Sequence, residues 1–167
     1  FILLVIGIFL FLRSLRTNEK YKEKDFRSHL ERTVLPYSEA MGYMYEGEGY
    51  MVGALARMNL AKEKLHLKTK ESAAEALNLF PSTDIFYNNL AQAIEILHSV
   101  DESIDIFSNN KFAPEAIIKG NEKEGAVGIG VVEAPRGTLY HKIEIGEDGK
   151  VCSGEVVVPT GQNQINI

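Results

Sequence analysis

The residues from 81 to 110 carry the most regular hydrophobic pattern in the chain, and this pattern limits the fold more than any other feature. The segment Pro81–Asp84 has the composition of a helix start. Apolar residues then recur at alternating steps of four and three, and these are Phe86, Leu90, Ala93, Leu97, Val100, Ile104 and Phe107. Such steps place side chains on one stripe of a helix. The sequence therefore predicts a long helix, with Asn109 and Asn110 at its end.

A second stripe of the same helix is polar. Its members have the same spacing and are Asn88, Gln92, Glu95, Ser99 and Glu102. Two interpretations stay open, a solvated face or a functional face, and the solvated face is the ordinary outcome for such a pattern.

From Gly125 onward the pattern changes to an alternation with a step of two. Val127, Ile129 and Val131 alternate with glycines, the residues from 138 to 145 alternate between polar and apolar, and 151–158 is rich in strand-forming residues. The segment Gly146–Gly149 between two of these runs predicts a tight turn. We therefore expect an α+β fold that is mainly helical, with a small antiparallel β-sheet near the C-terminus.

The remaining segments complete the expected organisation. Residues 13–33 predict a charged helix, 36–53 an irregular packed loop, and 54–79 helices with a break near 65–69. This divides the chain into a helical region, 13–110, and a β-rich region, 125–160.

The wholly apolar segment 1–12 allows three interpretations: a buried core segment, the tail of a membrane helix, or a gene-boundary artefact. As a helix it would be about 18 Å long, against about 30 Å of bilayer core. The chain begins with Phe1 and ends directly after polar, turn-prone residues. We therefore expect it to be a piece of a longer protein.

Composition excludes several classes of protein. The net charge of −5 argues against a general nucleic-acid binder. With one cysteine, Cys152, the chain forms no internal disulfide framework and no multi-cysteine metal site of its own. The four histidines show no paired ligand spacing, and the glycines at 125, 128 and 130 lack the spacing of a dinucleotide loop. His141 shares a strand face with apolar residues, which predicts a half-buried, hydrogen-bonded histidine.

Two turn segments carry the candidate functional residues. In Glu133–Gly137, Pro135 and the following glycine make a rigid turn that can aim the guanidinium of Arg136 at an anion. The segment 158–166 places a hydroxyl and several amides in one stretch. The alternative for both segments is an ordinary turn between strands with a surface salt bridge.

Four segments, taken in order, resemble the large subunit of nickel-iron hydrogenases. They are PYSEAMGYMYEGEGYMVGALARMNL (36–60), FYNNLAQAIEILHSVDESIDI (86–106), EAPRGTLYHKIEI (133–145) and VVVPTGQNQINI (156–167). The resemblance covers about residues 25–167. Within the family, EAPRG followed by Tyr140-His141 and the PT-x-QN ending are similar to the cytoplasmic, multimeric type, which uses a soluble carrier such as a nicotinamide or a deazaflavin.

The resemblance implies the chemistry of the site. Family members hold a Ni-Fe(CO)(CN)2 centre on four thiolates from two cysteine pairs, and soft thiolates suit these metals. By this resemblance Arg136 lies just above the metals, donates to one cyanide and takes part in splitting dihydrogen, with Pro135 beside it. Thr160 donates its hydroxyl to the other cyanide, and Pro159 is adjacent. The implied partners are an iron-sulfur small subunit and electron-carrier subunits, and the implied location is the cytoplasm.

This chain departs from the family because neither cysteine pair is present, and Cys152 matches no ligand position. As given, it holds no metal and is expected to be inactive alone, as an internal or C-terminal-half fragment. Two alternatives stay open. One is a metal-free scaffold subunit related to the quinone-site subunit of respiratory complex I, and the other is a plain interaction module in which the two segments are only turns.

Overall fold

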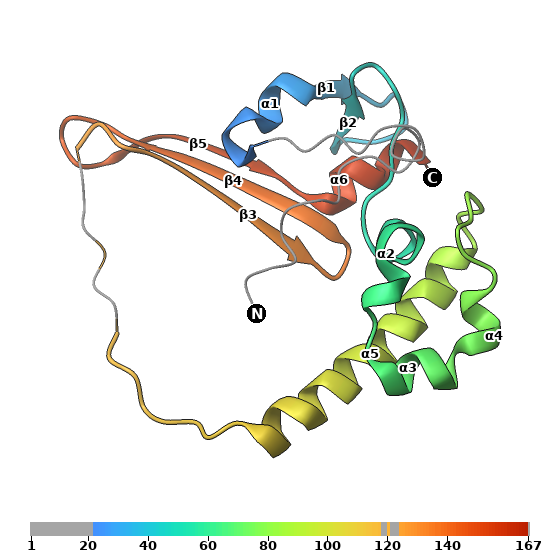
Figure 1. Cartoon of the computed structure of the whole chain (residues 1–167). Helices are drawn as coiled ribbons and strands as arrows, with labels where there is room; N and C mark the ends of the chain where they lie inside the picture. The colour runs from blue at the N-terminus through green and yellow to red at the C-terminus, as the bar shows by residue number, and fades with distance from the viewer. Residues whose placement is uncertain (1–21, 118–119, 121–123, 167) are drawn as a thin grey trace.

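The computed structural model describes residues 22–117, 120 and 124–166. Figure 1 shows a group of helices on one side and two small sheets with a short helix on the other. The helices pack on one hydrophobic core and the sheets on another. The expected α+β class, mainly helical with a small antiparallel sheet near the C-terminus, is confirmed. The apolar segment 1–12 lies outside the described residues, as does 13–21 of the helix predicted to follow it.

The helical part consists of short helices packed against one long helix. They are α2 (Ala54–Ala61), η2 (Lys62–Lys64), α3 (Leu67–Ser72), α4 (Ala74–Leu77) and the long α5 (Tyr87–Asn109). The core between them includes Leu55, Met58, Phe80, Ala91 and Ile94. The break predicted near 65–69 lies at Leu65 and His66, between η2 and α3.

Helix α5 forms as predicted, but a different face of it is buried. Its buried residues are Ala91, Ile94 and Asp101. The predicted apolar stripe is largely exposed, since Phe86 is 80% and Phe107 75% accessible. The pattern identifies the helix correctly. It does not tell which face of the helix the neighbouring elements cover, and α2 and α3 pack on the face beside the apolar stripe.

The sheet near the C-terminus has the expected antiparallel meander. Its strands are β3 (Val127–Ala134), β4 (Gly137–Ile145) and β5 (Val151–Val157), in that spatial order. The β3–β4 register ends at the pair Ala134 and Gly137, which leaves a two-residue turn. Tyr140 of β4 is buried and stacks on Phe26, with 4.9 Å between ring centroids.

The prediction for the N-terminal third is partly wrong. After η1 (Glu23–Asp25) and α1 (Phe26–His29), the chain forms β1 (Leu30–Val34) and then β2 (Met41–Tyr45), which pair antiparallel. The predicted helix therefore ends at His29, and the predicted loop 36–53 contains a strand. The charged composition favours a helix locally, but the strand partner and the buried tyrosines of β2 override it. The loop is packed as expected, because Tyr43, Tyr45, Tyr50 and Val52 are buried.

The C-terminal segment forms a short helix that packs on both sheets. α6 (Pro159–Asn163) is followed by η3 (Gln164–Asn166). α6 lies beside β2 and the start of β4.

Within the described ranges, none of the helices is both long enough and apolar enough to cross a membrane.

One buried polar pair joins α3 to α5 and supports a stability prediction. The hydroxyl of Thr69, which is fully buried, donates to the carboxylate of Asp101 at 2.6 Å. Replacing Thr69 with valine keeps the shape but leaves a buried carboxylate oxygen without this donor. We expect the free energy of unfolding, measured with urea, to fall by about 2 kcal/mol. The exposed Thr83→Val is the control and should change it little. An unchanged stability of Thr69→Val would contradict this account of the pair.

Candidate functional site

The β3–β4 turn presents Pro135 and Arg136 at its tip. Gly137 follows with φ +129°, a conformation that side-chain-bearing residues rarely adopt. A Cβ at Gly137 would clash with the side chain of Val52 and lie 2.9 Å from the nitrogen of Gly53. The turn therefore depends on glycine at this position, as the sequence predicts, and it packs directly on the chain segment that enters α2.

Arg136 is exposed, and among residues 22–117, 120 and 124–166 nothing hydrogen-bonds or ion-pairs with its guanidinium. Its backbone is held, because its carbonyl accepts from the amide of Asn163 at 3.4 Å. The combination is a free cation on an anchored turn, which is what an anion-binding arginine requires.

Arg57 of α2 anchors the turn through hydrogen bonds. Its guanidinium donates to both carboxylate oxygens of Glu95, at 2.5 and 2.6 Å, and to the carboxylate of Glu133. It also donates to the carbonyls of Ala134 and Pro135, at 3.1 and 2.8 Å. Sequence reasoning missed this residue, although it stands in the LAR motif of segment 36–60 and Glu95 lies in the polar stripe of α5.

The polar stripe of α5 is thus not simply a solvated face. Glu95 binds Arg57, and the Asn88 side chain accepts from the backbone nitrogen of Leu55 at 3.2 Å. Gln92 and Ser99 of the same stripe are exposed. Two members therefore fix α2 against α5, and the stripe is partly a helix–helix contact.

The electrostatics of the anchor follow from its burial. For Arg57, burial lowers the pKa, but the hydrogen bonds and charges of Glu95 and Glu133 more than offset this and raise it. For Glu133, burial raises the pKa above its ordinary value of 4.5, against the opposing effects of the Thr138 hydroxyl and of Arg57. The Thr138 hydroxyl donates to the second oxygen of Glu133 at 2.8 Å.

This shift predicts a pH dependence of stability. Because the pKa of Glu133 is raised on folding, the folded protein keeps its proton to a higher pH than the unfolded chain. The contribution of the protonated Glu133 to the free energy of unfolding is full below pH 4.5. It is lost as the pH rises from there through the raised pKa. We expect Glu133→Gln to remove this part of the decline in urea-unfolding curves taken between about pH 4 and 7. The exposed Glu31→Gln should keep it, and equal pH profiles for the wild type and Glu133→Gln would contradict the assignment.

The second candidate segment is α6, and its amides bind the same region of backbone. Gln162 is fully buried, accepts from the Tyr50 hydroxyl at 2.9 Å and donates to the Thr138 carbonyl at 2.6 Å. The Asn163 side chain bonds both the nitrogen and the carbonyl of Val52, at 2.8 and 2.9 Å. Gln162 and Asn163, two of the amides noted in the sequence, are therefore structural clamps.

The structure brings the two candidate segments together through a side chain of α6. The Asn163 amide donates to the carbonyls of Val52 and Arg136, so α6 is held both to the turn and to the segment that enters α2. Pro159 is buried, whereas Thr160 is exposed, and its hydroxyl has no hydrogen bond to any described residue. No contact joins the Thr160 hydroxyl to the Arg136 guanidinium among these residues.

A cleft of about 1110 Å³ opens between the turn, α2 and α5. Pro135 and Arg136 line it at one end, and Ile96, Val100, Ile104 and Phe107 of α5 line its apolar wall. Pro159 and Thr160 do not line this cleft. Arg136 thus faces a large apolar cleft, while Thr160 lies outside it.

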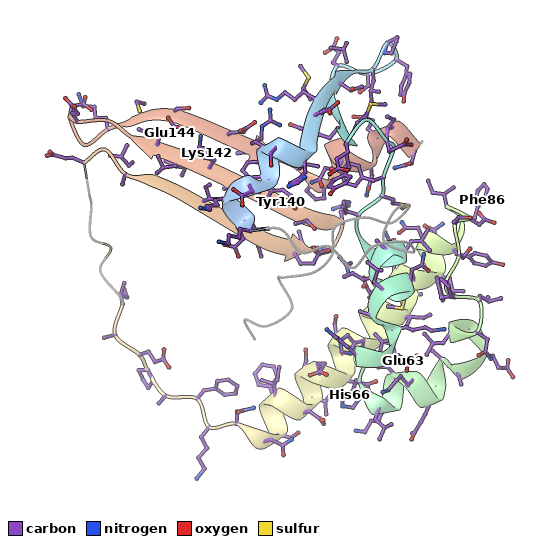
Figure 2. All side chains as sticks on the ribbon, turned by 45° about the horizontal axis from the view of Figure 1, so that its top comes forward. Glu63, His66, Phe86, Tyr140, Lys142 and Glu144 are labelled. Atoms are coloured by element: carbon purple, nitrogen blue, oxygen red, sulfur yellow. The ribbon has the colours of Figure 1, made fainter. Side chains whose placement is uncertain are left out.

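His141 and Cys152 are both exposed on the three-stranded sheet. His141 is exposed, not half-buried, because the face of β4 that carries it has no covering element in the described part of the chain; Tyr140 on the opposite face is in the core. Cys152 is exposed on β5 and donates weakly to the Glu144 carbonyl at 3.5 Å. Figure 2 shows Tyr140 and Glu144 on the same β4 ribbon.

The residues present do not fit a metal held by four thiolates. The chain has a single cysteine, and the described residues contain no group of three or more His, Cys, Asp or Glu side chains arranged to hold a metal ion. What the site offers instead is an anchored cation and an exposed hydroxyl, which could bind anionic groups held by other residues.

Comparison with known proteins places this chain in a family. Residues 13–165 match the family described as nickel-dependent hydrogenase. Sulfhydrogenase 1 subunit alpha of Pyrococcus furiosus is 33% identical over 147 residues, which is 87% of this chain and 34% of the relative. The NAD-reducing hydrogenase HoxS subunit beta of Cupriavidus necator is 30% identical over 153 residues, 83% of this chain and 30% of the relative. The chain belongs to the nickel-dependent hydrogenase family.

The fold agrees with this assignment. A solved NAD+-reducing [NiFe]-hydrogenase in the H2-reduced state superposes with a TM-score of 0.64 at 25% identity, over 87% of this chain and 34% of that chain. This chain spans about a third of the length of the relatives it matches.

Proposed function

We propose that this chain is a segment of the large subunit of a nickel-iron hydrogenase, which reversibly splits dihydrogen into protons and electrons. The observation that carries the proposal is Arg136, an exposed guanidinium that pairs with no residue in the described part of the chain, on a turn anchored by Arg57 and Asn163. The chain belongs to this family. A fixed cation of this kind stabilises negative charge that develops during a reaction.

The proposed roles follow the family resemblance. Arg136 acts beside the Ni-Fe centre and donates to one of its cyanides, with Pro135 shaping the turn. Thr160 donates to the other cyanide, and the buried Pro159 fixes the start of α6 beneath it. The exposed Thr160 hydroxyl and the exposed Arg136 guanidinium both support this proposal, because neither donates to any residue that the structure describes.

The thiolates would have to come from residues outside this sequence. The single, exposed Cys152 supports this proposal. By this reasoning the chain alone binds no Ni-Fe centre and is inactive, and the centre belongs to the intact parent protein.

The proposed partners are an iron-sulfur small subunit and electron-carrier subunits. The names of relatives support this, because one is subunit alpha of a sulfhydrogenase and another is subunit beta of an NAD-reducing hydrogenase. A cytoplasmic location remains part of the same proposal. The exposed apolar stripe of α5, which includes Phe86 and Phe107, is the kind of surface that further protein would cover.

The coding DNA on both sides of this segment tests the proposal. In-frame Cys-x-x-Cys pairs upstream and downstream would support a nickel-iron hydrogenase. In-frame flanks without these pairs would contradict it and would favour the metal-free scaffold subunit, the alternative that the single cysteine of this chain also allows.

A further inference from the structure

The Arg57 guanidinium is saturated with acceptors. Two oxygens of Glu95, one of Glu133 and the carbonyls of Ala134 and Pro135 take up its donors. Only 12% of the side chain is exposed. A fork of this kind holds several acceptors in fixed directions, which a lysine cannot do.

The same cleft is lined by a second arginine, Arg136, whose guanidinium has no such partner among the described residues. Glu95, Glu133 and Arg136 all line the cleft next to Arg57. Glu133 stands three residues before Arg136 on the same hairpin, and Arg136 is the second residue of the turn that joins Ala134 to Gly137. Because Glu133 lines the same cleft, its carboxylate is a competing partner for the Arg136 guanidinium unless another cation neutralises it, since opposite charges attract.

We propose that Arg57 is the positioning residue of this site: it occupies Glu95 and Glu133 and so keeps the Arg136 guanidinium free to bind an anion. It performs two tasks with one side chain. Its bonds to the Ala134 and Pro135 carbonyls set the direction of the turn, and its bonds to the carboxylates remove the internal competitors for Arg136. The consequence for turnover rests on the proposed function, but the shielding of Arg136 does not.

Arginine labelling of the full chain tests the shielding. Phenylglyoxal reacts with accessible, unpaired guanidinium groups, and the rate at Arg136 is read by peptide mass mapping. We expect Arg57→Met to slow labelling of Arg136 roughly threefold to fivefold, the upper range for one new exposed ion pair. The double variant Arg57→Met/Glu133→Gln should restore most of the rate. The matched control is Arg32→Met on β1, an exposed arginine that pairs with Glu155, and it should leave Arg136 unchanged.

A merely structural role gives the opposite pattern. Loss of anchoring alone would loosen the turn, leave Arg136 labelling equal or faster in Arg57→Met, and gain nothing from Glu133→Gln. Labelling of Arg136 that is equal or faster in Arg57→Met overturns the proposal. Slower labelling that Glu133→Gln does not restore overturns it as well.

A second variant keeps the test decisive if Arg57→Met does not fold. With Arg57 in place, Glu133→Gln should leave the Arg136 rate within about twofold, because Glu133 is already occupied. A rise of about threefold or more would mean that Glu133 already pairs with Arg136, and would overturn the proposal.

Turnover of the complete protein tests the consequence separately. We expect Arg57→Met to lower hydrogen oxidation by roughly 10- to 100-fold, as for other groups that orient a metal site, and the added Glu133→Gln to recover part of it. If the added Glu133→Gln recovers none of the hydrogen oxidation lost in Arg57→Met, the positioning role is contradicted. Absence of hydrogenase activity in the wild type would instead overturn the proposed function and leave the labelling result intact.

Discussion

Replacing Arg136 with alanine in the complete protein that contains this segment should lower hydrogen turnover by about 10²- to 10³-fold. The reason is the loss of a fixed cation at the position where charge develops. The side chain is exposed and has no partner among the described residues, so its removal should not disturb folding. Hydrogen-dependent reduction of a dye measures the turnover, and the melting temperature checks the fold.

The matched control is Arg32→Ala, which removes an exposed arginine from β1 and its ion pair with Glu155. Such pairs contribute little, so both turnover and melting temperature should stay near the wild-type values. Near-normal turnover of Arg136→Ala would contradict the role given to this arginine and would favour the interpretation of segment 133–137 as an ordinary turn.

Replacing Gly137 with alanine should destabilise the protein by about 4 kcal/mol, from backbone strain and overpacking together. The residue has φ +129°, and a Cβ there would lie 2.7 Å from the Cβ of Val52. Neither the turn nor the entry to α2 can move easily, because Asn163 clamps Val52 and Arg57 clamps the turn. Urea unfolding of the full chain measures the loss.

Gly128→Ala is the control on the neighbouring strand. A Cβ at Gly128 meets no atom within 4 Å, so alanine there should be neutral or slightly stabilising. Equal stabilities for the Gly137 and Gly128 variants would show that the contact between the turn and Val52 is not tight, and would weaken the case that Arg136 is held in a fixed place.

The elements with a strong local pattern were predictable. The steps of four and three after Asp84 predicted α5, and the alternation from 127 to 158 predicted β3, β4 and β5. The turn with Pro135 and Arg136 followed from its proline and glycine. In these segments the residues of each element supply the signal by themselves.

The elements that depend on a distant partner were not predictable. β1 is a strand because β2 pairs with it, although its own composition is charged. The buried face of α5 depends on where α2 lies, and the pattern along α5 holds no such information.

The candidate site shows the same division. Arg136 and Thr160 were found from their own segments and from the resemblance to the family. Arg57 was missed because its contacts come from four distant residues, Glu95, Glu133, Ala134 and Pro135, that only the fold brings together. A single arginine in a helix gives no sign of such contacts.

The infrared spectrum of the complete protein, purified with its partner subunits, tests whether a Ni-Fe(CO)(CN)2 centre is present. We expect stretching bands of metal-bound carbon monoxide and cyanide, with nickel and iron in equal amounts by elemental analysis. A protein without these bands and without nickel would contradict the account, and the free donors of Arg136 and Thr160 would then lack the ligands proposed for them.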